Sequence, residues 1–380
     1  MTPSQIGTLC RGSLASALTF LGIASIGLAG AQPPASDLQI AWRDAATLSV
    51  EGRGFADTKA VFDRLPRSAE GRVRQPVWDL SHDSAGMLVH FSTDACELRV
   101  RWDLLSDSLA LPNLASSAAS GLDLYVRIGR DWHWLAAARP EPSHKANEAT
   151  LFKDLPAGYR EYLLYLPLYN GIESLQLGFP VGSRIDPVVR QGKPIVFYGT
   201  SITQGGSVAR PGMAYPAVLG RRLDMPVVNL GFSGNAKAEP EIAELVSSVD
   251  SACYVLDCLP NLGSDEVPRM EKLVAALRSR HPTTPIVLVE APEYPDGVLI
   301  ASRRAWSDQD NAALRAVYEK ARRNDPLLFY VPTDGLIGED GEGTVDGTHP
   351  TDLGTMRMVE KIQPILAAAL VAETSKSRSP

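Results

Sequence analysis

Polar residues suited to acyl-transfer chemistry follow four apolar, β-rich runs in the second half of this sequence. Ser201 comes after the first run, Gly231 after the second and Asn261 after the third, and the loop behind the last run carries Asp346 and His349. A serine hydroxyl is a poor nucleophile until an imidazole accepts its proton and a carboxylate orients that imidazole. Ser201, His349 and Asp346 therefore predict a catalytic triad.

The acid of this triad is chosen by its distance along the chain from the histidine. Asp346 precedes His349 by three residues, so a single turn of loop can bring the two side chains together. Asp334 and Asp340 share the loop but lack this short offset. We therefore expect Asp346, rather than either of the other two, to orient the imidazole.

A tetrahedral oxyanion also needs preorganised hydrogen-bond donors. The candidates are the backbone N–H groups of Ser201 and Gly231 and the carboxamide of Asn261, and a glycine at 231 would let the backbone approach the substrate closely. Each of these residues also has a purely structural interpretation. Ser201 can cap a helix, Asn261 can be a turn residue after Pro260, and Gly231 can serve a tight turn.

Three side chains close behind the serine are candidates for the wall of a substrate pocket: Arg210, Met213 and Tyr215. The loop 290–306, which holds two aromatic residues and two arginines, is a second candidate region. A proline-rich surface loop is the commoner explanation for such a stretch.

The elements that must position these residues differ between the two halves of the chain. From about 38 to 185, short runs separated by turn residues predict a jelly-roll-like β-sandwich, with strands near 87–92, 97–102, 122–128, 162–168 and 174–179. From 193 to 373, strands and helices alternate, which predicts a three-layer α/β/α domain with a parallel sheet. Its strands are expected at 194–198, 227–230, 253–256, 286–289 and 328–331, and its helices at 239–249, 265–280, 307–324 and 352–373. The fold class is therefore α/β, and ligands should gather at the carboxyl ends of the parallel strands.

The two ends of the chain are expected to lie outside these domains. Residues 1–31 combine one basic residue, a short apolar run and the small-residue site Ala29-Gly30-Ala31, which is typical of a cleaved signal peptide. A membrane anchor is the alternative, because the run approaches the length that spans a bilayer. We expect a secreted or periplasmic protein with no membrane contact after cleavage. Residues 374–380 are expected to form a disordered tail.

Composition excludes several classes of protein. The 380 residues carry 37 Lys and Arg against 44 Asp and Glu, without a basic run, so nucleic acid is not an expected partner. Outside the signal, Cys96, Cys253 and Cys258 form no even-numbered disulfide framework, and we interpret the last two as small buried residues. No C-x-x-C or H-E-x-x-H pattern indicates a metal site.

Taken together, the polar blocks resemble the SGNH (GDSL-like) hydrolases. The blocks at 199–201 (G-T-S), 229–231 (N-L-G), 259–261 (L-P-N) and 346–349 (D-G-T-H) occur in the family's order, with Gly-Thr-Ser in place of Gly-Asp-Ser. The resemblance matches Ser201, Gly231, Asn261 and His349 to the four letters of the name, and Asp346 to the triad acid. It implies hydrolysis of an ester without a cofactor, often of an acetyl or other short acyl group on a sugar. Some relatives transfer acyl groups to alcohols.

A second resemblance covers the first half of the chain. Residues 121–125 (G-L-D-L-Y) are similar to the G-x-D-L-Y signature of a β-sandwich module that precedes one branch of these enzymes. We expect Asp123 and Tyr125 to stabilise the sandwich or to face the domain junction.

Other enzyme classes explain the residues less well. An α/β-hydrolase needs glycine where Thr203 stands, and a dehydrogenase needs a G-x-G-x-x-G that Gly205-Gly206 does not supply. A glycosidase uses two carboxylates and explains neither the serine nor the oxyanion donors. The sequence thus predicts a secreted serine esterase that acts on a small-molecule or carbohydrate ester without cofactor or metal. An acyltransferase on the same triad and a non-catalytic carbohydrate-binding protein are the alternatives.

Overall fold

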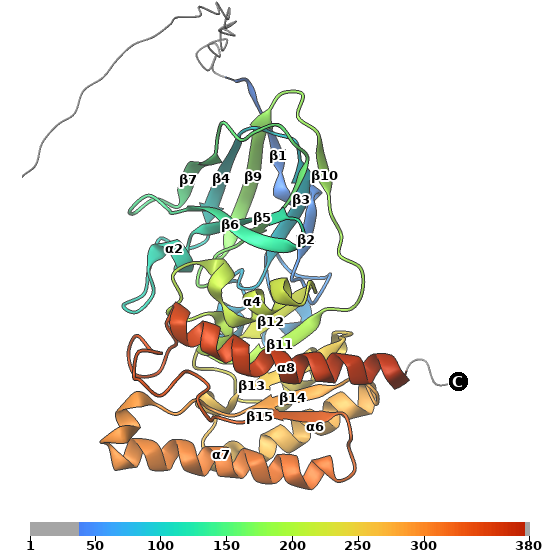
Figure 1. Ribbon diagram of the computed structural model, residues 1–380, viewed down its shortest axis with the longest axis vertical. Coiled ribbons are helices and arrows are strands. Elements are labelled where there is room, and N and C mark those ends of the chain that lie inside the picture. The colour runs from blue at the N-terminus through green and yellow to red at the C-terminus, as the bar shows by residue number, and fades with distance from the viewer. Residues whose placement is uncertain (1–37, 377–380) are drawn as a thin grey trace, which may run out of the picture. The chain divides into compact units, whose positions relative to one another are not determined.

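This computed structural model describes residues 38–376 of the chain (Figure 1). These residues form two antiparallel sheets, one parallel sheet and the helices that accompany them. The predicted signal peptide, residues 1–31, lies outside the described residues, as do residues 377–380 of the predicted tail. None of the helices within 38–376 has the length and apolar character needed to cross a bilayer.

The antiparallel sheets form the predicted sandwich. One has the order β1-β9-β4-β7, and the other has the order β10-β3-β8-β5-β6 with β2 also paired to β3. Side chains of β4 alternate between buried and more exposed positions, as expected for a strand with one face on the core. Trp102, Phe91, Tyr162 and Phe179 fill the space between the sheets. The strands are β1 (Ile40–Asp44), β2 (Ser49–Glu51), β3 (Leu88–Thr93), β4 (Leu98–Leu104), β5 (Leu122–Ile128), β6 (Asp131–Ala138), β7 (Ala146–Phe152), β8 (Arg160–Tyr165), β9 (Ile172–Pro180) and β10 (Ile185–Pro187).

The third sheet is wholly parallel, in the order β12-β11-β13-β14-β15. Its strands are β11 (Ile195–Gly199), β12 (Val227–Gly231), β13 (Cys253–Asp257), β14 (Ile286–Val289) and β15 (Leu328–Val331). They are apolar on both sides because helices cover both faces of the sheet. Helices α4 (Tyr215–Arg222) and α8 (Asp352–Lys376) pack on one face, with α8 lying across the sheet in Figure 1. Helices α5 (Pro240–Ser248), α6 (Pro268–Arg280) and α7 (Ala301–Arg322) pack on the other.

The predicted fold class is confirmed, and every predicted strand corresponds to an observed one. Cys253 and Cys258 are buried in the cores on opposite faces of the parallel sheet. One predicted boundary is wrong: the helix expected at 307–324 is α7, which begins at Ala301, and the Ser307 hydroxyl bonds the carbonyl of Arg304 inside it. Helix α8 also extends three residues beyond its predicted end.

The segment between β2 and β3, residues 52–87, belongs to the sandwich in sequence but packs into the core of the parallel sheet. Helix α1 (Gln75–Leu80) buries Val77 and Trp78 there. The fully buried guanidinium of Arg64 donates hydrogen bonds to the carbonyl oxygens of Leu80 and Asp83 in this segment and of Gly231 at the end of β12. A buried polar donor is costly unless it is satisfied, so these bonds fasten the segment to the sheet edge where the predicted site lies.

Candidate active site

Ser201, His349 and Asp346 form a continuous chain of hydrogen bonds. The Ser201 Oγ lies 2.9 Å from His349 Nε2, and His349 Nδ1 lies 2.8 Å from Asp346 Oδ2. Serine and histidine are 148 residues apart in sequence, so only the folded sheet brings them together. This is the geometry in which an imidazole can remove a proton from a serine hydroxyl.

The nucleophile candidate sits at a sharp strand-to-helix turn. β11 ends at Gly199, and Ser201 is the first residue of the short helix α3 (Ser201–Gln204), whose cap is the Thr200 side chain bonded to the Ile202 N–H. The carbonyl oxygen of Ser201 accepts a hydrogen bond from the hydroxyl of Tyr169, a residue of the sandwich. Ser201 is 7% exposed, so only a small part of its surface is accessible to solvent.

The histidine is carried by the long loop between β15 and α8. A bridge between Thr344 and Pro350 closes this loop into a tight hairpin-like turn. Gly347 has φ +79° in that turn, a conformation that glycine adopts without strain. The turn places Asp346 directly behind the imidazole of His349.

The charge on Asp346 fixes the tautomer of the histidine. Partial burial opposes its ionisation, but hydrogen bonds from the backbone N–H and ring of His349 and from the Thr348 N–H lower the pKa of Asp346 to about 2. An ionised carboxylate only accepts hydrogen bonds, so the proton of a neutral imidazole lies on Nδ1. Nε2 is then free to accept the Ser201 proton.

The structure corrects the expectation that Gly231 donates to the oxyanion. The Gly231 N–H already donates to the side-chain oxygen of Asn229 at 2.8 Å. A Cβ at this position would lie 2.3 Å from the backbone nitrogen of Gln204. Glycine at 231 therefore allows β12 to lie close against helix α3.

Three other donors remain open at this edge of the sheet. Within residues 38–376 no acceptor is found for the backbone N–H of Ser201, the backbone N–H of Gly234 or the Nδ2 of Asn261. Gly234, which sequence analysis did not select, has φ +70° in the exposed turn after β12. The turn is held beside the serine because Ser233 N–H bonds Gln204 and Ala236 N–H bonds Asn261 Oδ1.

Comparisons with known proteins extend over both halves of the chain. The family model described as "GDSL-like Lipase/Acylhydrolase family" matches residues 192–367, and that described as "N-terminus of Esterase_SGNH_hydro-type" matches residues 40–185. The crystal structure of a GDSL-like lipase from Bacteroides ovatus ATCC 8483 is 34% identical, with a TM-score of 0.83 over 88% of this chain and 98% of that one.

The chain belongs to the GDSL-like lipase/acylhydrolase family. It is an SGNH-type serine hydrolase, an esterase, and its first half is the module that precedes one branch of the family. A search of curated proteins gives no match.

More distant solved structures share the fold. A salicylyl-acyltransferase from a tetracycline biosynthetic pathway, SsfX3, has a TM-score of 0.71 at 19% identity, over 87% of this chain and 97% of that one. An acetyl xylan esterase from the rumen bacterium Butyrivibrio proteoclasticus has a TM-score of 0.56 at 13% identity, over 87% of this chain and 100% of that one.

The three predicted pocket residues of this SGNH hydrolase contact the sandwich or a buried carboxylate, and none is bonded to Ser201 or His349 in the described residues. Arg210 donates to Asp123 Oδ2 and to the hydroxyl of Tyr125, so these two sandwich residues face the segment that follows helix α3. Met213 packs against the same junction. Tyr215 is 1% exposed and bonds a buried carboxylate. Their closeness to Ser201 in sequence was misleading because the chain turns toward the sandwich directly after α3.

The loop 290–306 reaches the loop that carries His349. Arg303 Nη2 donates to the hydroxyl of Thr348 at 2.7 Å, and its guanidinium lies 3.9 Å from the ring of Tyr294. Tyr294 in turn stacks on Trp306. These aromatic faces are covered by each other and by the arginine, so they support the loop that carries the histidine.

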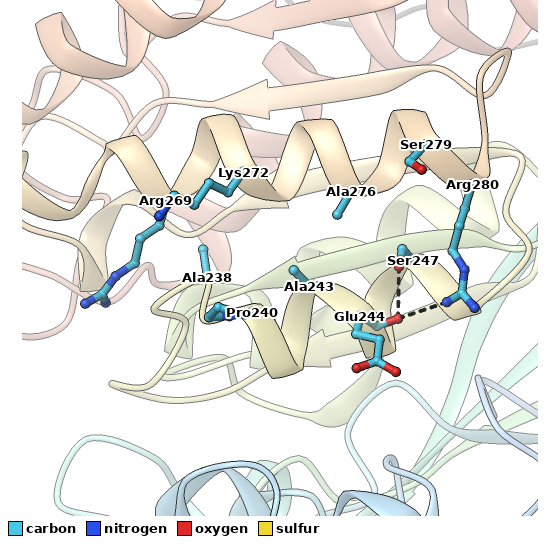
Figure 2. Close-up of a pocket in the computed structure, with 10 residues that line it drawn as sticks. All are labelled: Ala238, Pro240, Ala243, Glu244, Ser247, Arg269, Lys272, Ala276, Ser279 and Arg280. Atoms are coloured by element: carbon cyan, nitrogen blue, oxygen red, sulfur yellow. Dashed lines mark hydrogen bonds between the residues drawn. The ribbon is translucent and has the colours of Figure 1, made fainter.

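A separate groove of about 600 Å³ lies between α5 and α6 (Figure 2). Figure 2 shows small side chains along it and basic side chains toward both ends, with the Glu244 carbonyl accepting bonds from Ser247 and Arg280. None of its lining residues belongs to the hydrogen-bonded chain described above, and we assign it no part in the reaction. The lining residues are Ala238, Pro240, Ala243, Glu244, Ser247, Arg269, Lys272, Ala276, Ser279 and Arg280.

A second carboxylate lies beneath helix α3. Asp257, at the end of β13, accepts hydrogen bonds on Oδ2 from the hydroxyls of Thr203 at 2.9 Å and Tyr215 at 3.0 Å. Complete burial raises the pKa of Asp257 from 3.8 to about 7, against the effect of these two bonds. A carboxyl group whose pKa is higher in the folded than in the unfolded protein loses stabilisation as pH rises between the two values.

Replacing Asp257 with asparagine should remove this pH dependence. Asparagine resembles the protonated acid, can accept the same two hydroxyls and does not titrate. We expect Asp257→Asn to gain stability relative to the wild type as pH rises from about 4 to about 7, and to keep that gain above. Denaturant unfolding between pH 5 and 8.5 measures the difference, with the exposed Asp265→Asn as control. Parallel stability curves for wild type and Asp257→Asn would contradict the assignment.

Proposed function

We propose that this SGNH esterase is exported and hydrolyses short-acyl esters, acetyl esters above all, on carbohydrates through a Ser201–His349–Asp346 triad. The observation that carries the proposal is the unbroken chain of hydrogen bonds, 2.9 and 2.8 Å long, that runs from the serine through the imidazole to the carboxylate.

Each triad residue has one task in the proposed reaction. Ser201 Oγ attacks the ester carbonyl carbon while its proton passes to Nε2 of His349, and Asp346 stabilises the imidazolium. Collapse of the tetrahedral intermediate breaks the bond to the alcohol, which leaves with the proton from His349. Water then attacks the acyl-enzyme, gives its proton to the same nitrogen and releases the acid with a free serine.

The oxyanion of each tetrahedral intermediate is proposed to bind the N–H groups of Ser201 and Gly234 and the Nδ2 of Asn261. All three are open donors at the carboxyl edge of the sheet, and the Gly231 N–H is not, because Asn229 holds it. Donors fixed before the reaction stabilise developing charge without reorganisation.

The carbohydrate substrate and the export are supported less directly. The acetyl xylan esterase from B. proteoclasticus and the family two carbohydrate esterase from Cellvibrio japonicus share the fold. The pattern of residues 1–31 supports a cleaved signal peptide, which would bring the enzyme to extracellular polysaccharide. We propose 38–185 and 193–373 as its two domains.

Replacing Ser201 with alanine should lower turnover by about 10⁴-fold or more, because the acyl-enzyme cannot form. The thermal melt should change little, since the Oγ has a single hydrogen-bond partner, His349. The measurement is acetate release from acetylated xylo-oligosaccharides, combined with fluorophosphonate labelling and peptide mapping. We expect one adduct, on Ser201, that is absent from Ser201→Ala and His349→Ala and present in the exposed control Ser279→Ala. Undiminished acetate release by Ser201→Ala would refute the triad.

Removing the carboxamide donor should slow the same reaction. We expect Asn261→Ala to lower kcat by about 10²–10³-fold with little change in KM, because the oxyanion exists only near the transition state. Asn261→Asp keeps an oxygen for the Ala236 N–H and removes only the donor, so it separates catalysis from loop support. The exposed Asn324→Ala is the control. A change confined to KM would place Asn261 in substrate binding instead.

Acyl transfer to an alcohol is the second candidate, favoured by the shared fold of the salicylyl-acyltransferase. If water is the natural acceptor, acetate release will account for all ester consumed even with excess glycerol or cellobiose present. A new acetyl ester of the added alcohol, detected by mass spectrometry at the expense of acetate, would instead identify a transferase.

A further inference from the structure

One side chain from the sandwich reaches the proposed triad. Asn113 lies in the loop between β4 and helix α2 (Ser116–Ala119), more than 200 residues before the catalytic loop in sequence. Its Nδ2 lies 2.9 Å from Asp346 Oδ2, the same oxygen that accepts from His349 Nδ1. We propose that Asn113 is a positioning residue of the reaction, which fixes the Asp346 carboxylate from the sandwich side. The inference rests on the triad proposed above.

Asn113 completes the set of donors around this carboxylate. Asp346 Oδ1 accepts from the backbone N–H groups of Thr348 at 3.1 Å and His349 at 2.8 Å, and Oδ2 accepts from His349 Nδ1 and Asn113 Nδ2. A carboxylate has about four acceptor positions, and here each has a donor. Three of those donors come from the catalytic loop itself, so Asn113 is the one that ties the acid to a different part of the fold.

The orientation of the Asn113 amide follows from the chemistry of its neighbours. An ionised carboxylate accepts hydrogen bonds and cannot donate them, so the NH₂ group and not the oxygen must face Asp346. The 3.3 Å approach of Nδ2 to His349 Nδ1 is not a second hydrogen bond, because that ring nitrogen already donates to Asp346. The amide and the ring therefore converge on one oxygen from two sides.

The backbone around Asn113 is built to hold this position. Leu111 and Leu114 exchange both backbone hydrogen bonds, at 2.9 and 3.1 Å, which closes a tight turn with Pro112 and Asn113 at its tip. Proline presets the backbone at such a turn and lowers the freedom that the tip must lose.

The turn is also anchored to the hydrolase half. Leu114 is 3% exposed and packs in a cluster with Val208 and Ala214 from the segment behind the nucleophile. Ser117, one turn further on, donates to the carbonyl oxygen of Ala209 at 2.8 Å. Asn113 is thus held from both sides against a carboxylate whose side chain is 34% exposed.

The role can be separated from general stability by a double-mutant cycle. Asn113→Ala should lower kcat for p-nitrophenyl acetate by about tenfold, the effect of one hydrogen bond to a charged group, with KM and the thermal melt little changed. In an Asp346→Ala background the same substitution should change kcat by less than about twofold, because its partner is gone. Asp107→Ala, an exposed position in the same loop, is the matched control.

Asn113→Asp provides an independent readout. It keeps the shape and turn preference of asparagine and brings a second negative charge to the Asp346–His349 pair. The cation near this pair is Arg303 of α7, which bonds Thr348. The imidazolium is then stabilised, so the acid limb of the pH profile of kcat/KM should move to higher pH. A residue that only supports the fold would leave that limb in place.

The outcomes are distinguishable. Equal losses from Asn113→Ala in both backgrounds, or no loss and no shift of the acid limb with Asn113→Asp, overturn the positioning role and leave the triad intact. Full activity of Asp346→Ala removes the triad acid itself, and with it both proposals.

Discussion

The 2.9 Å contact between Ser201 Oγ and His349 Nε2 is the constraint on which the rest of the structure depends. Ser201 follows the inner strand β11, whereas His349 follows β15 at the sheet edge, and β13 and β14 lie between them. The loop after β15 must therefore pass the ends of β14 and β13 before it can place the imidazole beside Ser201. Two contacts stabilise this part of the loop: the hydrogen-bonded turn at Asp346 and the bond from Arg303 to Thr348. The geometry of the proposed triad is thus a property of the loop and not of the strands.

The sandwich takes part in the same constraint. Arg64 bonds the carbonyl at the end of β12, Tyr169 bonds the carbonyl of the serine, and Arg210 links the segment behind the serine to Asp123. Buried polar groups hold their partners firmly because leaving any of them unpaired is costly. The Bacteroides ovatus relative, which this chain covers over 98% of its length, also contains both halves.

Periodicity and turn residues were sufficient to predict the fold class and all five strands of the parallel sheet, because strands buried on both faces are continuous apolar runs. They did not predict β6 (Asp131–Ala138), which contains exposed Trp134 and His133 and lacks a clear apolar side.

The candidate triad could also be predicted from the sequence, since strand ends of a parallel sheet share one edge. Asn113 could not be read, because a lone asparagine after proline is an ordinary turn residue and its partner lies 233 positions away. The oxyanion role predicted for Gly231 was wrong because the sequence does not show which of Gly231 and Gly234 packs against the backbone of another element.

Two aspartates near Ser201 show how environment rather than residue type assigns the acid. Asp346 is partly exposed and accepts two backbone N–H groups besides the imidazole, and its pKa falls to about 2. Asp257 is fully buried beneath α3 with two hydroxyl donors, and its pKa rises to about 7. Only the first carries a full charge at neutral pH, and only a charged carboxylate stabilises the imidazolium that forms when the serine loses its proton. The neutral form of Asp257 lets a polar group sit under the nucleophile helix without attracting the imidazolium. The opposite shifts of the two pKa values therefore agree with Asp346 as the proposed acid, since the bonds from His349 and Thr348 that lower its pKa form in the same three-residue turn.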